Sequence, residues 1–378
     1  MQLAVSPNSA EIHVYSTVPA SEPGRWERTA VLREHDQVVC SLDWARGSGK
    51  LLSCSHDRNV YVWTPPCEPG GAWAPQLVVH GLNRAALCCS WAPSERKFAV
   101  GSGAGALAVC CYEAENDWWV GKLVKRHHAA SLLCVAWHPT QPLLATACAD
   151  GVVRVLAAAV RGVDSAPVGG EAKFGDVLLS VDVGGGWAHC VAWAPRGDAL
   201  AFLTHAGGAH FLGGLQCDRA GQWGGGAAAA AAPQAVPLGP SSLPALSIAF
   251  LSDTTAIAAG FDCAPLLLAR TLQGWQLAGE VAAAEDGAPG CDKKSAFSER
   301  LASFKSQTER GEAPPGGDAD APATGAPQGL HQNTITCVRA MPGLDGGFST
   351  SGTDGRLAVW SAAPSELTRL GFGALTLA

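Results

Sequence analysis

Histidine, serine and aspartate side chains occur in this chain in an order and at a spacing that could assemble a hydrolytic triad. The first set consists of His35, Ser53 or Ser55, and Asp57. In a triad the serine attacks a carbonyl carbon, the histidine accepts the serine proton, and the aspartate orients the histidine. A triad is needed once per active site, so the rest of the sequence decides whether this interpretation holds.

The same set recurs further along the chain, which favours a structural role over catalysis. Each copy runs from a histidine through alternating apolar residues to a turn that contains aspartate, and then into a strand that ends in tryptophan or leucine. In a WD40 blade these polar groups form one buried hydrogen-bonded chain that fixes the turn against the strands. The predicted structural network consists of His35, Ser53 (or Ser55), Asp57, Trp63, His128, Asp150, His331, Asp354 and Trp360.

Seven such units, three complete and four weaker, follow one another along the chain. Their short strands are separated by turns rich in Pro, Gly and Asp. The spacing is about that of one propeller blade except before the last unit, which follows an insertion. We therefore predict an all-β fold, a single seven-bladed WD40 β-propeller over residues 1–378. The third strands of the units are predicted to end near Tyr15, Trp63, Tyr112, Leu156, Leu212, Leu268 and Trp360.

Two segments do not fit the blade pattern. Residues 213–245 carry an alanine tract flanked by Gly and Pro and are predicted to be a flexible loop between blades. Residues 279–330, rich in Ala, Gly, Pro, Asp and Glu, are predicted to be a mostly disordered insertion between blades six and seven.

One stretch of that insertion, about residues 296–308, has the pattern of a short amphipathic helix. Phe297, Leu301 and Phe304 fall on one face, and Arg300 and Lys305 border it. A helix of this length is marginal alone in water and needs a surface to pack against. That surface is either the flank of the propeller or a groove on another protein, and we favour the partner groove.

Other chemistry-bearing residues favour structural interpretations. The glycine-rich segment Gly101–Ala106 is not followed by GK[ST] and precedes a strand-like run, so we predict a turn between strands. The adjacent Cys88 and Cys89 lack the CxxC-type spacing of a zinc site, and His127 beside His128 lacks further ligands. We expect no metal, no cofactor and no enzymatic activity.

The segment from Glu113 to Trp119 combines acidic residues with two adjacent tryptophans. It fits an acidic aromatic docking surface, and it equally fits the loop and outer strand of one blade. Adjacent residues of a strand point to opposite faces, so Trp118 and Trp119 cannot both face the same side.

Composition excludes several classes of protein. The chain is 47% hydrophobic and 16% charged, with a formal net charge of −7 and a pI of about 5.9. It therefore offers no basic surface for nucleic acid. No long uninterrupted apolar stretch or signal peptide is recognisable, so we expect a soluble, unsecreted protein without membrane insertion. Most of the 14 cysteines lie in apolar strand-like runs and are expected to be reduced.

Specific stretches of the sequence resemble one known family. The segment LNRAALCCSWAPSERKFAVGSGAGALAVCCYEAENDWWV closely resembles the propeller subunit of the actin-related protein 2/3 complex. So do SPNSAEIHVY, EHDQVVCSLDW, DRNVYVWT, AAGFDCAPLL and SERLASFKS. The likeness runs over most of the chain, and stretches such as KFAVGSG and ENDWW are more specific than a generic WD repeat.

The resemblance implies a non-catalytic core subunit of the assembly that nucleates branched actin filaments. Its partners would be the actin-related proteins, the other subunits, the mother filament and nucleation-promoting factors, in the cytoplasm at the actin cytoskeleton. ATP would be bound by the actin-related subunits. In the family the insertion helix touches actin or an actin-like partner. By motif match this implied contact falls on Phe297, Arg300, Leu301, Phe304 and Lys305.

The chain departs from the family pattern at two places. The family has a further N-terminal stretch, before the position of Gln2, that holds the first strand of the first blade. The alanine-rich loop and the acidic, Pro-rich part of the insertion also differ. We therefore expect the first and last blades to be the least stable, since unpaired strand edges remain. The tail RLGFGALTLA has alternating apolar residues that could supply a closing strand.

Overall fold

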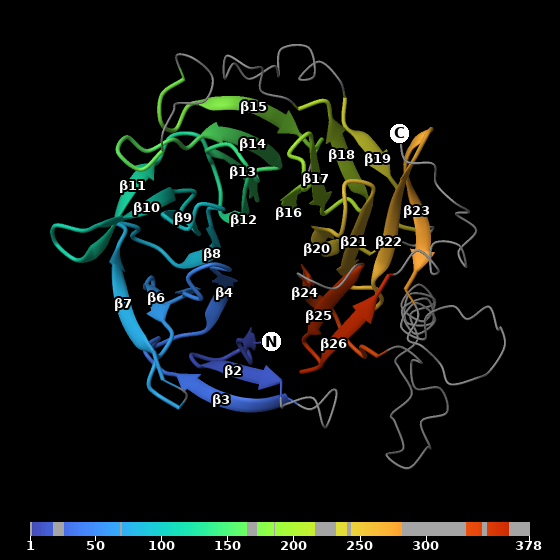
Figure 1. The fold of residues 1–378 in the computed structure, drawn as a ribbon. Helices are drawn as coiled ribbons and strands as arrows, with labels where there is room; N and C mark the ends of the chain where they lie inside the picture. Colours follow the sequence, from blue (N-terminus) through green and yellow to red (C-terminus); the bar gives the residue numbers. More distant parts are fainter. Residues whose placement is uncertain are drawn as a thin grey trace, which may run out of the picture. The chain divides into compact units, whose positions relative to one another are not determined.

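Short apolar runs separated by turns form antiparallel strands in the computed structural model (Figure 1). The structure describes residues 2–17, 26–68, 70–164, 172–184, 186–215, 232–239, 243–281, 330–341 and 346–362. Every regular element in these ranges is a strand, which confirms the predicted all-β class. The helix predicted at about 296–308 and the tail RLGFGALTLA lie outside the described residues.

The chain divides into two compact units. Unit 1 comprises residues 1–206 and 211–233, and unit 2 comprises residues 207–210 and 234–378. Unit 1 begins with a three-stranded sheet of order β1-β2-β3, formed by β1 (Gln2–Val5), β2 (Ile12–Thr17) and β3 (Trp26–Leu32).

The largest sheet of unit 1 has eight strands in the order β4-β5-β6-β7-β11-β10-β9-β8. Its strands are β4 (Val39–Trp44), β5 (Leu51–Ser55), β6 (Val60–Thr64), β7 (Ala74–Val79), β8 (Ala86–Trp91), β9 (Lys97–Ser102), β10 (Leu107–Glu113) and β11 (Trp118–Val124). The next sheet, of order β12-β13-β14-β15, consists of β12 (Leu132–Trp137), β13 (Leu143–Cys148), β14 (Val152–Ala157) and β15 (Val177–Asp182).

The fourth sheet has the order β16-β17-β18-β19, and the unit boundary falls within it. Its strands are β16 (Ala188–Trp193), β17 (Ala199–Thr204), β18 (Ala209–Gly213) and β19 (Gln234–Val236). Unit 2 holds a sheet of β20 (Ala245–Phe250), β21 (Thr255–Gly260), β22 (Leu266–Thr271) and β23 (Gly274–Glu280), and one of β24 (Ile335–Ala340), β25 (Gly347–Gly352) and β26 (Leu357–Ser361).

Four strands of unit 1 are buried along their whole length. Every residue of β5, β9, β13 and β17 is buried. Apolar side chains of neighbouring strands pack on both faces of β5, β9 and β13, which explains why these strands appear in the sequence as nearly continuous apolar runs and not as alternations. Figure 1 shows β4, β8 and β12 on the inner side of unit 1 and β7, β11 and β15 on its outer side.

The predicted third strands are β2, β6, β10, β14, β18, β22 and β26, and each ends within a few residues of its predicted position. One eight-stranded sheet contains the strands of two successive units. The outer strands β7 and β11 pair in parallel, Trp119 with Val78 and Val120 with Val79, and so join two sheets into one.

Local chemistry explains this junction. The Gln76 side chain donates to the Asp117 carbonyl at 2.7 Å and accepts from Trp119 Nε1–H at 3.1 Å. Gly121 allows the backbones to approach, since a Cβ atom there would lie 2.7 Å from the His80 Cα atom.

Part of the loop predicted at 213–245 is also a strand. β19 lies within it, and the Gln234 side chain accepts from the Trp275 backbone N–H and donates to the Trp275 carbonyl, both at 2.9 Å. A strand of three residues, Gln-Ala-Val, is too short to give a strand signal in the sequence. Its contact with Trp275 depends on a side chain bound to a distant backbone. Residues 216–231 of the predicted loop are outside the described part of the chain.

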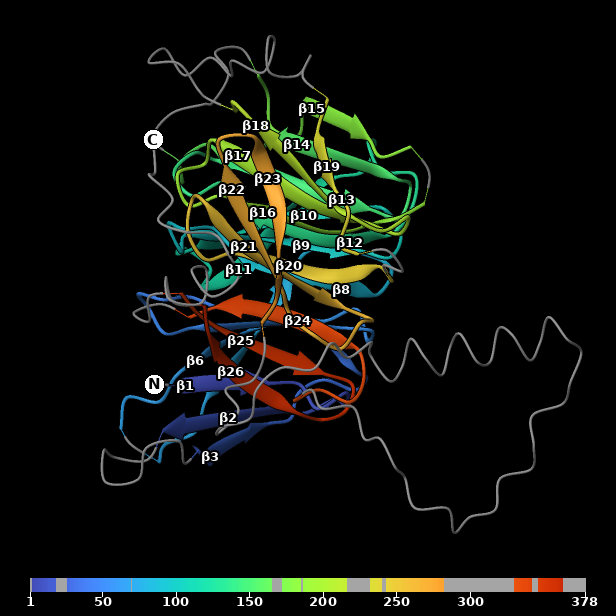
Figure 2. The ribbon, with the colours of Figure 1, turned by 90° about the vertical axis from the view of Figure 1, so that its right-hand side faces the viewer.

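Unit 2 is held together through its first strands. β20 and β24 pack side by side (Figure 2). Ser247 Oγ accepts a hydrogen bond from the Val338 backbone N–H at 3.0 Å. The buried Phe348 and Trp360 rings stack with their centroids 6.0 Å apart. The sheets of this unit therefore share one apolar core.

Candidate functional site

The first histidine set forms one continuous hydrogen-bonded chain. His35 Nδ1 lies 2.9 Å from Asp57 Oδ2, and His35 Nε2 lies 2.8 Å from Ser53 Oγ. Trp63 Nε1–H donates to Ser53 Oγ at 2.8 Å. Ser55 stands outside the chain, because its hydroxyl donates to the Gln37 carbonyl at 2.9 Å. The structure thus resolves the choice between the two serines in favour of Ser53.

The protonation states of His35 and Asp57 determine which group donates each hydrogen bond of this network. Burial lowers the pKa of His35, against the opposing effect of Asp57, so the ring is neutral at pH 7. Burial raises the pKa of Asp57, but hydrogen bonds from the Asn59 and Asp36 backbone N–H groups and from His35 outweigh it and leave the pKa below its usual value. The consistent arrangement has Trp63 donating to Ser53, Ser53 to His35 Nε2, and His35 Nδ1–H to the Asp57 carboxylate.

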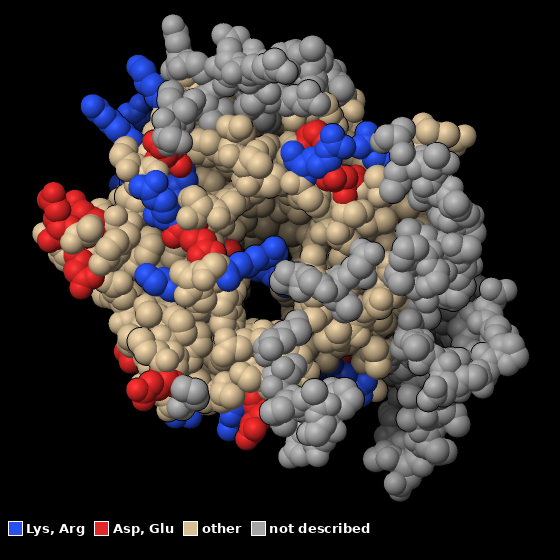
Figure 3. Space-filling view, viewed as in Figure 1, with Lys and Arg blue, Asp and Glu red and all other residues tan. Residues whose placement is uncertain are grey.

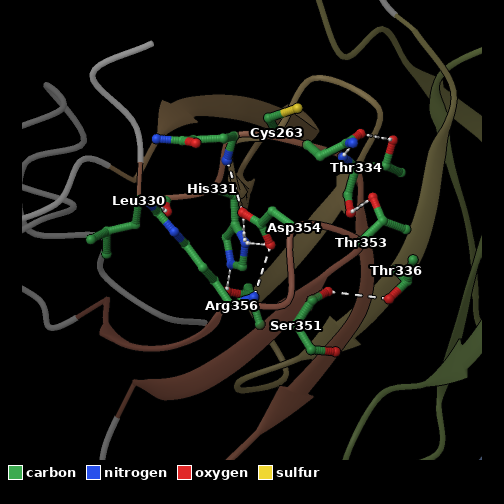
Figure 4. Close-up of polar contacts among 12 residues, drawn as sticks. Cys263, Leu330, His331, Thr334, Thr336, Ser351, Thr353, Asp354 and Arg356 are labelled. Atoms are coloured by element: carbon green, nitrogen blue, oxygen red, sulfur yellow. Dashed lines mark hydrogen bonds and ion pairs between the residues drawn. The ribbon is translucent and has the colours of Figure 1, made fainter. Parts of the chain in front are cut away.

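The third set repeats this geometry in unit 2. His331 Nδ1 lies 3.2 Å from both oxygens of Asp354, and His331 Nε2 lies 2.7 Å from Thr350 Oγ1 (Figure 4). Trp360 Nε1–H donates to Thr350 Oγ1 at 2.7 Å. The Asp354 carboxylate also accepts from the Arg356 backbone N–H at 3.0 Å, and so closes the turn that follows β25.

The middle set is not brought together as predicted. His128 Nε2 lies 3.0 Å from Thr146 Oγ1, but His128 Nδ1 has no hydrogen-bond partner among the described residues. The Asp150 carboxylate instead pairs with Arg154 at 2.9 Å, because a guanidinium four residues away offers a stronger partner than a neutral imidazole. Burial, followed by the charge of Arg154, lowers the pKa of His128 to about 4.

The hydroxyl residues of the second and third sets, Thr146 and Thr350, are not among the residues predicted from the sequence. Their distance from the histidine is close to that of Ser53. Ser53 follows His35 by 18 residues, Thr146 follows His128 by 18, and Thr350 follows His331 by 19. Only the first copy was assigned its hydroxyl from the sequence. An offset of 18 residues identifies Thr146, whereas after His331 it falls on Ser349, one residue before Thr350.

The buried position of these sets excludes the triad interpretation. Ser53 and Thr350 are 0% and 1% exposed, and each hydroxyl is already occupied by an indole and an imidazole. A nucleophile must reach a substrate carbonyl, whereas these oxygens are enclosed by the sheet. The arrangement can hold a turn against two strands, and it cannot carry out acyl transfer.

A second buried polar contact in unit 1 was not foreseen. Lys97 is 1% exposed, yet its ammonium group donates to Asp164 at 2.5 Å and to the Ala158 carbonyl at 2.8 Å. The same nitrogen lies 4.8 Å from the centre of the Trp137 ring. Burial lowers the pKa of Lys97, opposed by Asp164. The lysine thereby ties β9 to the segment that follows β14.

The structure also shows where the glycine-rich segment, the two adjacent tryptophans and the cysteines lie. Gly101–Ala106 spans the end of β9 and the turn before β10, as predicted. Trp119 is 2% exposed and Trp118 is 45% exposed, so the two side chains face opposite sides of β11. Among the described residues, no disulfide joins the cysteines, no group of three or more His, Cys, Asp or Glu could hold a metal ion, and no helix is long and apolar enough to cross a membrane.

The residues implied to contact actin lie outside the described part of the chain. They are Phe297, Arg300, Leu301, Phe304 and Lys305. Their role therefore rests on the sequence.

Repeated four-stranded sheets with a His, Ser or Thr, Asp and Trp network define a class of protein, the WD40-repeat proteins. In agreement, a sequence model of the family described as WD domain, G-beta repeat, matches residues 26–64 and 121–155. Among curated proteins, the chain is 37% identical to subunit 1B of the actin-related protein 2/3 complex from Arabidopsis thaliana, over 95% of this chain and 90% of that protein.

Relatives from distant organisms give the same result. The chain is 34% identical to subunit 1 of the complex from Schizosaccharomyces pombe, over 89% of this chain and 88% of that protein. It is 32% identical to subunit 1A-B from Xenopus laevis, over 95% and 90% respectively. The chain belongs to the family of actin-related protein 2/3 complex subunit 1, whose members are non-catalytic subunits.

Proposed function

We propose that this protein is a scaffold subunit of the actin-related protein 2/3 complex and supports the nucleation and branching of actin filaments. The observation that carries the proposal is likeness to subunit 1 proteins over nearly the whole of both chains, at 37% identity for one of them. Burial of the only triad-like sets in the described chain agrees with a role in which binding, and not chemistry, is the contribution.

For the fold, the proposal is a single seven-bladed propeller over residues 1–378. Seven third strands, β2, β6, β10, β14, β18, β22 and β26, support seven blades. Inner strands of successive sheets contact one another within each unit, as β4 does β8, β8 does β12 and β20 does β24. A propeller presents wide faces to several partners at once, which suits a scaffold.

The partners in this proposal are the actin-related proteins and the other subunits of the complex, the actin filament and nucleation-promoting factors. The location is the cytoplasm, at the actin cytoskeleton. Affinity purification of the tagged chain from its own cells tests the assembly. The expected result is co-purification of both actin-related proteins in equal amounts with the chain. Recovery of the intact chain with an unrelated set of proteins, such as ubiquitin-transfer components, would overturn the proposal.

For the insertion, the proposal is that the segment at about 296–308 is a helix that docks its apolar stripe onto actin or an actin-like partner. Burying two Phe and one Leu contributes about 1.5–3 kcal/mol per side chain before ordering costs. The triple variant Phe297→Ala/Leu301→Ala/Phe304→Ala should join the complex but bind filaments and branch them less well. The double variant Arg300→Ala/Lys305→Ala is a control with a smaller expected effect, and equal branching by the parent and the triple variant would refute the docking.

A further inference from the structure

The junction between β7 and β11 places three large apolar side chains on the outer side of unit 1. Leu77 is 51% exposed, Val79 is 54% exposed and Trp118 is 45% exposed. Trp119 pairs with Val78 across the junction, and both of these side chains are buried. Because successive residues of a strand alternate between faces, Leu77, Val79 and Trp118 all lie on the opposite, outward face. We call these three residues the outer patch.

Hydrogen bonds hold the outer patch in place. Trp118 Nε1–H donates to Glu113 Oε2 at 2.6 Å, and Asn116 donates to the same oxygen at 3.0 Å. The Gln76 side chain, next to Leu77, is fixed by the Asp117 carbonyl and by Trp119. A surface ordered in advance loses little conformational entropy when it binds, which favours a binding role.

Acidic side chains border the outer patch on one side. Glu113, Glu115 and Asp117 are exposed at the tip of the β10–β11 hairpin, where Figure 3 shows a group of acidic side chains. None of the three forms an ion pair with a cation in the part of the chain that the structure describes. The other side of the patch opens into a shallow pocket of about 340 Å³ lined by Leu77, Val79 and Arg58, among others.

The strand edges limit how a partner can bind here. Beside the outer patch, Val78 and Val79 of β7 pair with Trp119 and Val120 of β11, so no further strand can be added between the two strands at these residues. A partner that covers the patch therefore contacts the face of the sheet through side chains. An exposed, well-ordered tryptophan among aliphatic residues is typical of the centre of a protein interface.

We propose that the outer patch is a docking surface for another subunit of the complex, one that presents an apolar side chain flanked by Lys or Arg. The apolar side chain would cover Leu77, Val79 and Trp118, and the cation would meet the acidic tip of the hairpin. Charge complementarity selects a basic partner, because the three acids have no cation of their own among the described residues. The proposal rests on the proposed function, since it takes the partner from the same complex.

The test compares two patch variants and a matched control in the complex reconstituted with the whole chain. Leu77→Ser/Val79→Ser removes the aliphatic part, and Glu115→Lys reverses one charge that forms no ion pair with any described residue. Leu272→Ser is the control, because Leu272 is 93% exposed in the turn between β22 and β23. Subunit stoichiometry after a salt wash is measured by mass spectrometry, with melting temperatures as a check on folding.

The expected result is that Leu77→Ser/Val79→Ser retains one neighbouring subunit at least about tenfold less well than the parent. Glu115→Lys should weaken the same subunit at low salt, and Leu272→Ser should match the parent. A complete complex with both patch variants would overturn the docking surface while leaving the proposed function standing. Failure of the parent chain to assemble would overturn both. A dimer of the chain that the patch variants abolish without loss of any subunit would also refute the proposal.

Discussion

Replacing Ser53 with alanine isolates the contribution of the buried network to stability. The Ser53 hydroxyl accepts from Trp63 Nε1–H at 2.8 Å and lies 2.8 Å from His35 Nε2. The substitution removes one oxygen atom from a position that is 0% exposed, so water does not replace the lost partner. One buried donor and one buried acceptor are left without a hydrogen bond, while the bond between His35 and Asp57 remains.

The magnitude follows from those two groups. Leaving a buried polar group unpaired costs about 1–3 kcal/mol, so two groups cost about 2–6 kcal/mol. For a cooperative unit of about 200 residues, 1 kcal/mol corresponds to roughly 2–4 °C in melting temperature. The expected fall in melting temperature is therefore about 4–24 °C.

Thr146→Val is the matched control, because it belongs to the same unit and to the incomplete network. Only His128 Nε2 loses a close partner there, since Leu156 stands where the first copy has Trp63. The control should cost about 1–2 kcal/mol. Urea unfolding followed by circular dichroism measures both variants against the parent. If Ser53→Ala is no more destabilising than Thr146→Val, the tryptophan-linked network does not carry the stability assigned to it.

Three further predictions concern single buried positions. His128 has a pKa of about 4 in the folded chain against 6.5 in the unfolded chain. Its contribution to the free energy of unfolding is therefore intact above pH 6.5 and declines by on the order of 3 kcal/mol as pH falls toward 4. The free energy of unfolding should depend less on pH in His128→Gln, and an unchanged slope would contradict the assignment. Gly121→Val should separate β7 from β11, since its Cβ would meet His80; hydrogen exchange at Val79 and Val120 should accelerate, and unchanged protection would disprove the close approach. Lys97→Met should cost about 3–5 kcal/mol by leaving the Asp164 carboxylate without its cation, with only the hydrogen bond from the Val160 backbone N–H. The added change Asp164→Asn should recover part of the loss in thermal melts, and a double variant as unstable as the single one would rule out the ion pair as the cause.

The regular part of the fold could be predicted because each unit is specified locally. The four fully buried strands β5, β9, β13 and β17 are largely apolar runs, and Asp57 and Asp354 lie in turns whose sequence signals are visible without any structure. The hydrogen bonds of His35 and His331 follow from the same short patterns. In these places the residues that interact are close in sequence or repeat at a constant interval.

Contacts between residues that are not related by the repeat could not be predicted from the sequence. The parallel pairing of β7 with β11 depends on Gln76, on Gly121 and on the turn at Asp117, which carry no strand-pairing signal by themselves. His128 Nδ1 has no hydrogen-bond partner among the described residues, because Arg154 pairs with Asp150 instead. A match to the repeat pattern cannot show which partner the carboxylate prefers.

Counting branches formed on actin filaments tests the scaffold function most directly. Complex assembled without this chain, complex assembled with it, and the incomplete complex supplied afterwards with purified chain are compared by fluorescence microscopy in the presence of a nucleation-promoting factor. The account predicts that branches are rare without the chain, and that adding the folded chain restores them in proportion to its incorporation. Equal branching with and without the chain, or folded chain that incorporates fully but restores no branches, would contradict it.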